Sequence, residues 1–238
     1  FFRDRAMRPG KPFAIQLDTG MNRLGLEAGE WSAIRAEALA AKPDFIMSHL
    51  ACADEPGHPA NASQLAAFRA MTEGCDVPLS LSATGGILLG PDYHFDLIRP
   101  GVGLYGGLPF TDAQPVVRLS LPVIQTRTVR AGEFVGYSAT WTADSPRRIA
   151  TVAAGYADGI LRSISSKGAS LYAAGTACPI VGRVSMDLIA VRCDAAPQLR
   201  EGDWVEIDYD LPSASKQSGL SQYELLTTLG SRFERRWI

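Results

Sequence analysis

The fold is decided by residues 12–47, which read PFAIQLDTGMNRLGLEAGEWSAIRAEALAAKPDFIM. A short apolar run over 12–17 precedes a helical pattern over 29–41, and a second apolar run follows at 45–47. The apolar positions of the helical pattern recur at helical spacing: Trp31, Ile34 and Ala38. A strand, a helix and a strand in this order predict a βαβ unit with parallel strands.

The same alternation continues beyond this stretch. A second helical pattern covers 61–73 and ends at Gly74, and two further apolar runs follow at 79–81 and 95–98. Four strand candidates are half the number that an eight-stranded (β/α)8 barrel contains. We therefore expect an α/β region, the C-terminal half of such a barrel, over residues 1–115.

The rhythm of the sequence changes near residue 116. Short alternating runs follow, separated by glycine and proline, and the run at 203–208 alternates as a half-buried strand should. A single helical pattern covers 221–229. These features predict a mostly β C-terminal domain over 116–238, so the fold class is α/β plus all-β.

Composition and charge exclude several classes of protein. The chain has 238 residues, 46% of them hydrophobic, and a net charge of -2, which excludes overall disorder and lacks the basic footprint of a nucleic-acid-binding protein. No apolar run approaches the roughly 18 residues that a membrane-spanning helix needs. The four cysteines show no metal-ligand spacing, and we interpret them as reduced thiols of a cytoplasmic protein: Cys52, Cys75, Cys178 and Cys193.

Polar residues follow several of the apolar runs. His49 ends the run that begins at 45, whereas His58 and His94 have the context of surface residues, so a three-histidine metal site is not expected. Arg23 and Arg99 follow two other runs. Because polar residues at the strand ends of a barrel meet at one mouth, these side chains suit a ligand that carries phosphate and carboxylate groups.

The segment GVGLYG at 101–106 matches the glycine pattern of dinucleotide-binding folds. That fold also needs a helix directly afterwards and an acidic residue about 20 positions further on. Pro109 and Pro115 oppose the helix, and 119–128 contains no Asp or Glu. We therefore favour a phosphate-binding loop, in which glycines let backbone N–H groups approach the ligand.

Seven motifs, in order and spacing, make the chain resemble the alanine racemases that use pyridoxal 5'-phosphate (PLP). They are LDTGMNRLGL (17–26), SHLACAD (48–54), LSATGG (81–86), LIRPGVGLYG (97–106), VGYSAT (135–140), GYADG (155–159) and VGRVSMD (181–187). The resemblance implies a barrel followed by a β domain and a homodimer with active sites shared between chains. It implies the interconversion of L- and D-alanine, which supplies D-alanine for peptidoglycan.

The resemblance also implies a role for individual residues. Tyr137 looks like the catalytic tyrosine, which acts as one of two bases inside the partner's barrel. Arg99 resembles the arginine that faces the pyridine nitrogen of PLP, and His49 would bridge Arg99 and Tyr137. An arginine at that nitrogen keeps its proton, and we expect this to suppress transamination.

Further residues correspond to ligand contacts of the family. Arg23 matches the arginine near the PLP phenolic oxygen and the substrate carboxylate. Met186 matches a backbone contact to that carboxylate, and Tyr156 a tyrosine at the substrate entry. The phosphate contacts implied are Ser82, Gly101 and Val102. The polar lining of the entry channel corresponds to Asp54, Arg162 and Arg183.

The chain departs from the family pattern at several positions. The family's second base is a lysine that also forms the Schiff base with PLP, and no lysine here has that context: Lys11, Lys42, Lys167 and Lys216. We therefore expect the chain to be the C-terminal portion of a racemase and to be inactive alone. Gln16 stands where many members have a modified lysine, Ser185 where cysteine is common, and Ser231 near the place of a phosphate-binding tyrosine.

Other functions stay open at this point. A broad-specificity or serine racemase fits the same motifs. A PLP-dependent amino-acid decarboxylase of the same architecture would place an acid at the pyridine nitrogen, where this chain has Arg99. A regulatory PLP-binding protein would lack the β domain at 116–238. An inactive, truncated product of a racemase is the remaining alternative.

Overall fold

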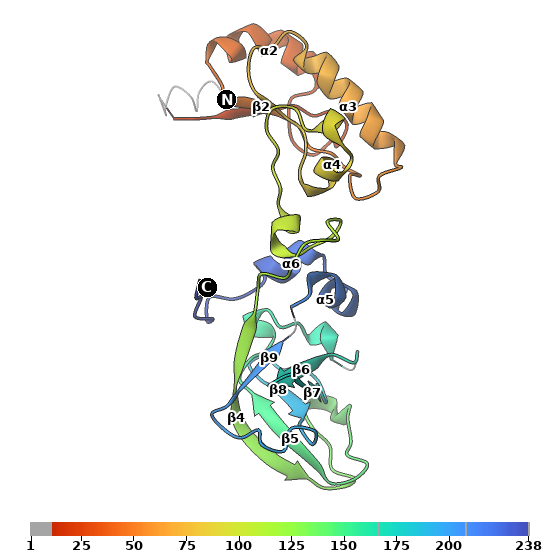
Figure 1. The fold of residues 1–238 in the computed structure, drawn as a ribbon, viewed down its shortest axis with the longest axis vertical. Coiled ribbons are helices and arrows are strands. Elements are labelled where there is room, and N and C mark those ends of the chain that lie inside the picture. The colour runs from red at the N-terminus through yellow and green to blue at the C-terminus, as the bar shows by residue number, and fades with distance from the viewer. Residues whose placement is uncertain (1–10, 166, 208, 238) are drawn as a thin grey trace. The chain divides into compact units, whose positions relative to one another are not determined.

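A computed structural model describes residues 11–165, 167–207 and 209–237, which divide into two compact units (Figure 1). The first unit comprises the described residues up to Leu104 together with Leu108–Ala113. The second comprises Tyr105–Gly107 and the described residues from Gln114 onward. The chain therefore passes between the two units more than once near residue 105.

The first unit is built on a parallel sheet with the strand order β1-β2-β3. These strands are β1 (Ala14–Gln16), β2 (Phe45–Met47) and β3 (Leu79–Ser80). Helix α2 (Ala28–Ala40) links β1 to β2, and α3 (Pro59–Thr72) links β2 to β3 (Figure 1). The βαβ units expected from the sequence are therefore present.

The core of the first unit lies between these helices and the sheet. Trp31 of α2 and Phe68 of α3 are fully buried, and the indole Nε1 of Trp31 donates to the Met71 carbonyl at 2.8 Å. The ring of Phe68 meets Phe95 edge-to-face at a centroid distance of 5.0 Å. Burial of these large rings stabilises the packing of both helices on the sheet.

The prediction of a fourth strand at 95–98 is wrong, because this segment does not form a strand. Phe95 adopts a φ of +54°, and Leu97 and Ile98 are 42% and 41% exposed. The carboxylate of Asp96 accepts from the N–H of Leu79 at 2.8 Å, a bond that a backbone carbonyl would accept in a regular ladder. An isolated parallel bridge follows between Ala83 and Arg99.

The second unit is built on a six-stranded antiparallel sheet with the order β7-β6-β9-β4-β5-β8. Its strands are β4 (Leu119–Val129), β5 (Arg147–Val152), β6 (Ser170–Ala173), β7 (Thr176–Pro179), β8 (Ile189–Arg192) and β9 (Trp204–Ile207). Ile180 bridges Val191, and Val181 donates to the Ala190 carbonyl at 2.9 Å. These contacts join the two ends of the sheet, which closes into a barrel.

Two helices follow the sheet, although the sequence analysis expected one. Helix α6 (Gln222–Thr227) is shorter than expected and begins after Ser221, whose hydroxyl forms a capping box with Glu224. Helix α5 (Leu211–Ser218) was not predicted, and it begins where Asp210 Oδ1 accepts from Ser213 N at 2.9 Å. The hairpin of β6 and β7 was not predicted either.

Short helices complete the two units. They are α4 (Thr84–Leu88), η1 (Pro91–Tyr93), η2 (Val102–Tyr105), η3 (Tyr137–Ala139), η4 (Tyr156–Asp158) and η5 (Arg162–Ile164). Across the described ranges, no helix has the length and apolar character needed to cross a membrane.

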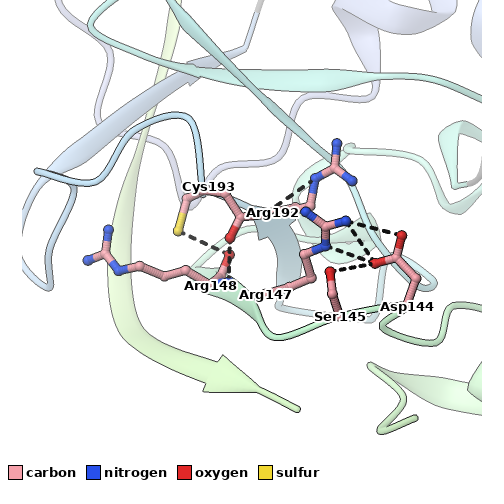
Figure 2. A network of polar contacts seen from close by, with 7 residues as sticks. Asp144, Ser145, Arg147, Arg148, Arg192 and Cys193 are labelled. Carbon is pink, nitrogen blue, oxygen red and sulfur yellow. Dashed lines mark hydrogen bonds and ion pairs between the residues drawn. The ribbon is translucent and has the colours of Figure 1, made fainter. Parts of the chain in front are cut away.

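A polar network fixes the start of β5 against the end of β8 (Figure 2). Arg147 Nε donates to Asp144 Oδ1 at 2.9 Å, and the backbone N–H of Arg148 donates to Asp194 Oδ1 at 2.7 Å. The Cys193 N–H donates to the Arg148 carbonyl at 2.9 Å. Side chains thus continue the ladder between β5 and β8 beyond the last paired residues.

Candidate active site

Arg99 is the centre of a polar cluster in the first unit. Its Nη1 donates to Ser80 Oγ at 2.5 Å, and its Nη2 donates to the Ser48 carbonyl at 2.7 Å. The same Nη2 lies 3.4 Å from His49 Nδ1 and 3.4 Å from the Leu81 carbonyl. Burial lowers the pKa of Arg99 below its ordinary value, yet a guanidinium stays protonated in proteins. The cluster therefore holds a half-buried cation.

His49 is neutral near pH 7. Burial lowers the pKa of its imidazole first, and the positive charges of Arg99 and Arg23 lower this pKa further. Arg99 has only donors, so its contact with Nδ1 requires Nδ1 to be the acceptor. The proton of the neutral ring then sits on Nε2, which leaves that nitrogen free to donate.

The loop that carries Arg23 is closed by the carboxylate of Asp18. Asp18 Oδ1 accepts from the N–H groups of Gly20, Met21 and Asn22 at 2.8–3.1 Å, and the Gly20 bond is the main cause of the lowered pKa of Asp18. Gln16 Nε2 donates to the Leu24 carbonyl at 2.8 Å. Gln16 therefore supports the backbone beside Arg23 through a neutral hydrogen bond.

The glycine loop at 101–103 is held by a hydroxyl of the motif LSATGG. Thr84 Oγ1 accepts from the N–H groups of both glycines of the loop, at 2.9 and 3.2 Å. Ser82 is fully buried, and its Oγ donates to the Tyr93 carbonyl at 2.6 Å. Thr84, two residues after Ser82 in the motif LSATGG, is thus the hydroxyl that contacts this loop directly.

Tyr137 stands on an unusual turn of the second unit. It is 69% exposed, and the following Ser138 and Ala139 have φ values of +60° and +45°. Non-glycine residues in this region are strained, and such strain gathers at functional sites. Arg183 Nη1 donates to Ser138 Oγ at 3.1 Å, which ties the turn to the motif VGRVSMD.

The same motif also contacts GYADG. The N–H groups of Tyr156 and Ala157 donate to the carbonyls of Ser185 and Met186, each at 3.0 Å. A Cβ on Gly155 would lie 2.3 Å from both carbonyls, so only glycine allows this approach. The side chains of Tyr156 and Met186 are both exposed. VGRVSMD thus brings three of the motifs of the second unit together.

Arg232 joins two of these motifs from the C-terminal segment. Its Nε lies 2.7 Å from Asp158 Oδ1 in GYADG, and its Nη1 lies 2.8 Å from Asp187 Oδ1 in VGRVSMD. Asp158 Oδ2 accepts from the Gly155 N–H at 3.0 Å. No motif in the sequence signalled this residue.

The other residues that the resemblance singled out lie on the surface. Asp54, Arg162 and Ser231 are exposed, and so are the lysines: Lys11, Lys42, Lys167 and Lys216. Ser185 donates through Oγ to the Leu188 carbonyl at 2.8 Å. The described structure thus groups Arg99 with His49 in the first unit, and Tyr137, Tyr156, Arg183 and Met186 through one motif in the second.

Comparisons with known proteins agree across the chain. The family model for the N-terminal domain of alanine racemase matches residues 4–109, and the model for its C-terminal domain matches 116–237. The alanine racemase of Cereibacter sphaeroides is 60% identical over 96% of this chain, and that of Jannaschia sp. is 56% identical over 98%. The chain spans 65% of the length of the Cereibacter protein and 68% of the Jannaschia protein.

Solved structures give the same result. The alanine racemase of Bartonella henselae, whose crystal structure holds covalently bound PLP, has a TM-score of 0.86 and 36% identity, and the match covers 100% of this chain and 70% of that one. The biosynthetic enzyme of Pseudomonas aeruginosa has a TM-score of 0.79 and 35% identity, over 98% of this chain and 70% of that one. The expected fold class is confirmed, and the chain belongs to the alanine racemase family.

Proposed function

We propose that this chain supplies the cofactor- and substrate-binding parts of an alanine racemase, which interconverts L- and D-alanine with PLP. The relatives support this proposal, because 60% identity extends over 96% of the chain. Contacts between the motifs support it as well. Arg99 meets His49 in the first unit, and Arg183 meets Ser138 in the second.

One observation carries the proposal. Within the described ranges, the hydrogen-bond partners of the half-buried Arg99 guanidinium are all neutral: Ser80, Ser48, Leu81 and His49. A desolvated cation without a carboxylate partner favours an electron-rich ligand. PLP fits this arrangement, with Arg99 at its ring nitrogen and Arg23 at its phenolic oxygen. Its phosphate would lie against the loop at Ser82, Gly101 and Val102, where the Ser82 hydroxyl and the Gly101 N–H would exchange their present partners, Tyr93 and Thr84, for phosphate oxygens.

Each residue then has a defined task. PLP, when bound, supplies the electron sink for the charge that develops at the α-carbon. Arg99 donates a hydrogen bond and keeps its proton. Tyr137 acts as one base and moves the α-proton on one face of the substrate, while His49 donates from Nε2 to the tyrosine oxygen. Arg23 and the backbone of Met186 hold the substrate carboxylate, and Tyr156 lines its entry.

We further propose a homodimer, in which Tyr137 of one chain serves the barrel of the other. The exposure of Tyr137 supports this assignment, because a free phenol on a surface turn is available to a second chain. The second base, a lysine, lies outside this chain in the proposal. The product D-alanine serves peptidoglycan synthesis in the cytoplasm.

The test compares this chain with a fused enzyme. In the fused enzyme, the part of the Cereibacter protein outside the match is joined ahead of this chain, and D-alanine formed from L-alanine in the presence of PLP is measured. We expect activity in the fused enzyme, loss of activity in its Tyr137→Phe variant, and none in this chain alone. Arg236→Gln, which alters an exposed ion pair with Glu234, is the matched control.

Three results would overturn parts of the proposal. A folded fused enzyme that binds PLP but does not racemise alanine contradicts the function. Faster turnover of serine, or release of carbon dioxide, favours the serine racemase or the decarboxylase. Racemisation by this chain alone contradicts the placement of the second base outside it.

A further inference from the structure

A buried amide interrupts the apolar face of α3. Gln64 is 2% exposed and lies beside Leu65, Phe68 and Met71, all of which are buried. Glutamine is seldom this deeply buried, because its amide loses hydrogen bonds to water. Such an amide is expected to be fully hydrogen-bonded, and its partners then show what it holds in place.

The amide of Gln64 is bound to the segment that carries His49. Its Oε1 accepts from the Ala51 N–H at 2.8 Å, and its Nε2 donates to the His49 carbonyl at 2.9 Å. Nε2 also donates to Thr19 Oγ1 at 3.3 Å. The side chain thus pairs with the backbone of 49–51 on both sides of Leu50, much as a neighbouring strand would.

The network continues from Gln64 to the guanidinium. Thr19 Oγ1 lies 2.8 Å from Ser48 Oγ, and both hydroxyl groups are buried. The carbonyl of Ser48 accepts from Arg99 Nη2 at 2.7 Å. Gln64 therefore connects the loops after β1 and β2 to the backbone of Ser48 and His49, the two residues that contact Arg99.

We propose that Gln64 is a positioning residue, which fixes the backbone of His49 so that Nδ1 stays against Arg99 and the Nε2 proton points away from it. Gln64 itself touches neither substrate nor cofactor in this assignment. The geometric part stands on the hydrogen bonds alone. The part that concerns catalysis rests on the proposed function, because it requires His49 to take part in racemisation.

Two substitutions separate hydrogen bonding from shape. Gln64→Glu keeps the outline of the side chain and can still accept from Ala51 N, but an ionised carboxylate cannot donate to the His49 carbonyl. Gln64→Met keeps a similar length, removes every bond and buries no charge. Gln198→Glu is the control, because it adds the same charge at an exposed position of the second unit.

The first measurement needs no activity and uses this chain as it is. Hydrogen exchange is followed at Ala51 N–H, and ring ¹⁵N shifts report the tautomer of His49. We expect exchange at Ala51 to accelerate about tenfold or more in Gln64→Met, which removes the acceptor of its N–H. In Gln64→Glu that acceptor stays, so exchange at Ala51 should accelerate less, through repulsion between the new carboxylate and the His49 carbonyl. The Nε2–H tautomer should lose its dominance in both variants. Amides of the second unit serve as the reference for global unfolding.

A pH series sharpens the test of Gln64→Glu. Once the new carboxyl is protonated it regains an O–H donor for the His49 carbonyl, so the protection of Ala51, measured as its exchange rate relative to the intrinsic rate at each pH, should rise as the pH falls. Gln64→Met, which has no titratable group, should show no such recovery. Unchanged exchange and an unchanged His49 tautomer in both variants would overturn the inference.

The second measurement uses the fused enzyme. We expect kcat to fall about 10- to 100-fold in Gln64→Met, with KM for alanine nearly constant, because misplacement of a catalytic group by about 1 Å has effects of this size. An unchanged kcat together with altered exchange would overturn the catalytic part of the inference. Inactivity of the unsubstituted fused enzyme would contradict the proposed function and leave the geometric result intact.

Discussion

Arg232 and Asp158 form an ion pair at 2.7 Å although 74 positions separate them in the sequence. The carboxylate of Asp158 is almost completely buried, at 6% exposure, whereas Arg232 is half exposed. Through the second contact of Arg232, with Asp187, the C-terminal segment holds the turns that present Tyr156 and Met186. The tail of the chain is therefore part of the candidate site.

We expect Arg232→Gln to lower the free energy of unfolding, because it leaves the buried carboxylate of Asp158 without its cation. The measurement is urea denaturation of this chain. Arg236→Gln breaks an ion pair that is exposed on both sides, so it should lower the free energy of unfolding less than Arg232→Gln does. Equal losses in the two variants would show that the pair with Asp158 is energetically a surface pair.

Two glycines with similar backbone angles allow a matched comparison. Gly182 and Gly175 have φ values of +68° and +81°, but a Cβ on Gly182 would lie 2.4 Å from the Val135 carbonyl, whereas one on Gly175 meets open space. Gly175→Ala should cost about 1–2 kcal/mol of stability from backbone strain alone. Gly182→Ala should cost about 1–3 kcal/mol more, since the backbone beside Tyr137 must move. Similar melting temperatures would refute the close approach.

His49 should make stability depend on pH. Its pKa is lowered in the folded chain from the ordinary value of 6.5, so the unfolded chain takes up the proton first. The contribution of His49 to the free energy of unfolding is therefore complete above about pH 6.5. It is lost as the pH falls toward the pKa that His49 has in the folded chain. NMR titration of the ring measures that pKa directly.

Arg23→Gln removes one of the two cations that act on His49, so the pKa of His49 should rise in this variant. Arg69→Gln is the control, because Arg69 pairs with Asp92 on the surface of the same unit. A titration curve of His49 that is the same in Arg23→Gln as in the parent chain would contradict the electrostatic coupling.

In the fused enzyme, Arg99→Glu should raise the amount of pyruvate formed for each D-alanine. A carboxylic acid can share its proton with the ring nitrogen, whereas a guanidinium keeps its own. Arg99→Lys preserves the cation, so its product ratio should stay low even though a lysine cannot reach both Ser48 and Ser80 as Arg99 does. An unchanged ratio in Arg99→Glu would disprove this role of Arg99.

The sequence predicted strands where an apolar run places a residue in the core, as Ile15 does in β1 and Ile46 in β2. It failed at 95–98, because apolar content does not report pairing, and Asp96 replaces the ladder there with its side chain. The sequence analysis did not predict helix α5 or the hairpin of β6 and β7, because these segments lack a run of large apolar residues. Their residues are mostly small or polar, and tertiary packing defines them.

The roles of Tyr137, His49 and Arg99 rest on the resemblance of their motifs to those of the family, and they stay predictions. The motifs alone did not show which side chains hold them in place: Thr84, which lies inside LSATGG, and Gln64 and Arg232, which lie outside the motifs. A glutamine on a helix or an arginine near the chain end is a surface residue by default. Their partners lie 13 to 74 positions away, and a local pattern carries no information at that range.

The two sheets differ in how they offer backbone groups to other chains. The antiparallel sheet is joined end to end through Ile180 and Val191. In the parallel sheet, Leu26 pairs beside the end of β1, and the start of this strand lies beside a groove lined by Leu24, Ile34 and Met47. An outer strand next to apolar side chains is a template for unwanted pairing. Self-association of the isolated chain should therefore start at β1, and a lysine in place of Ala14 should slow it while leaving the closed sheet untouched.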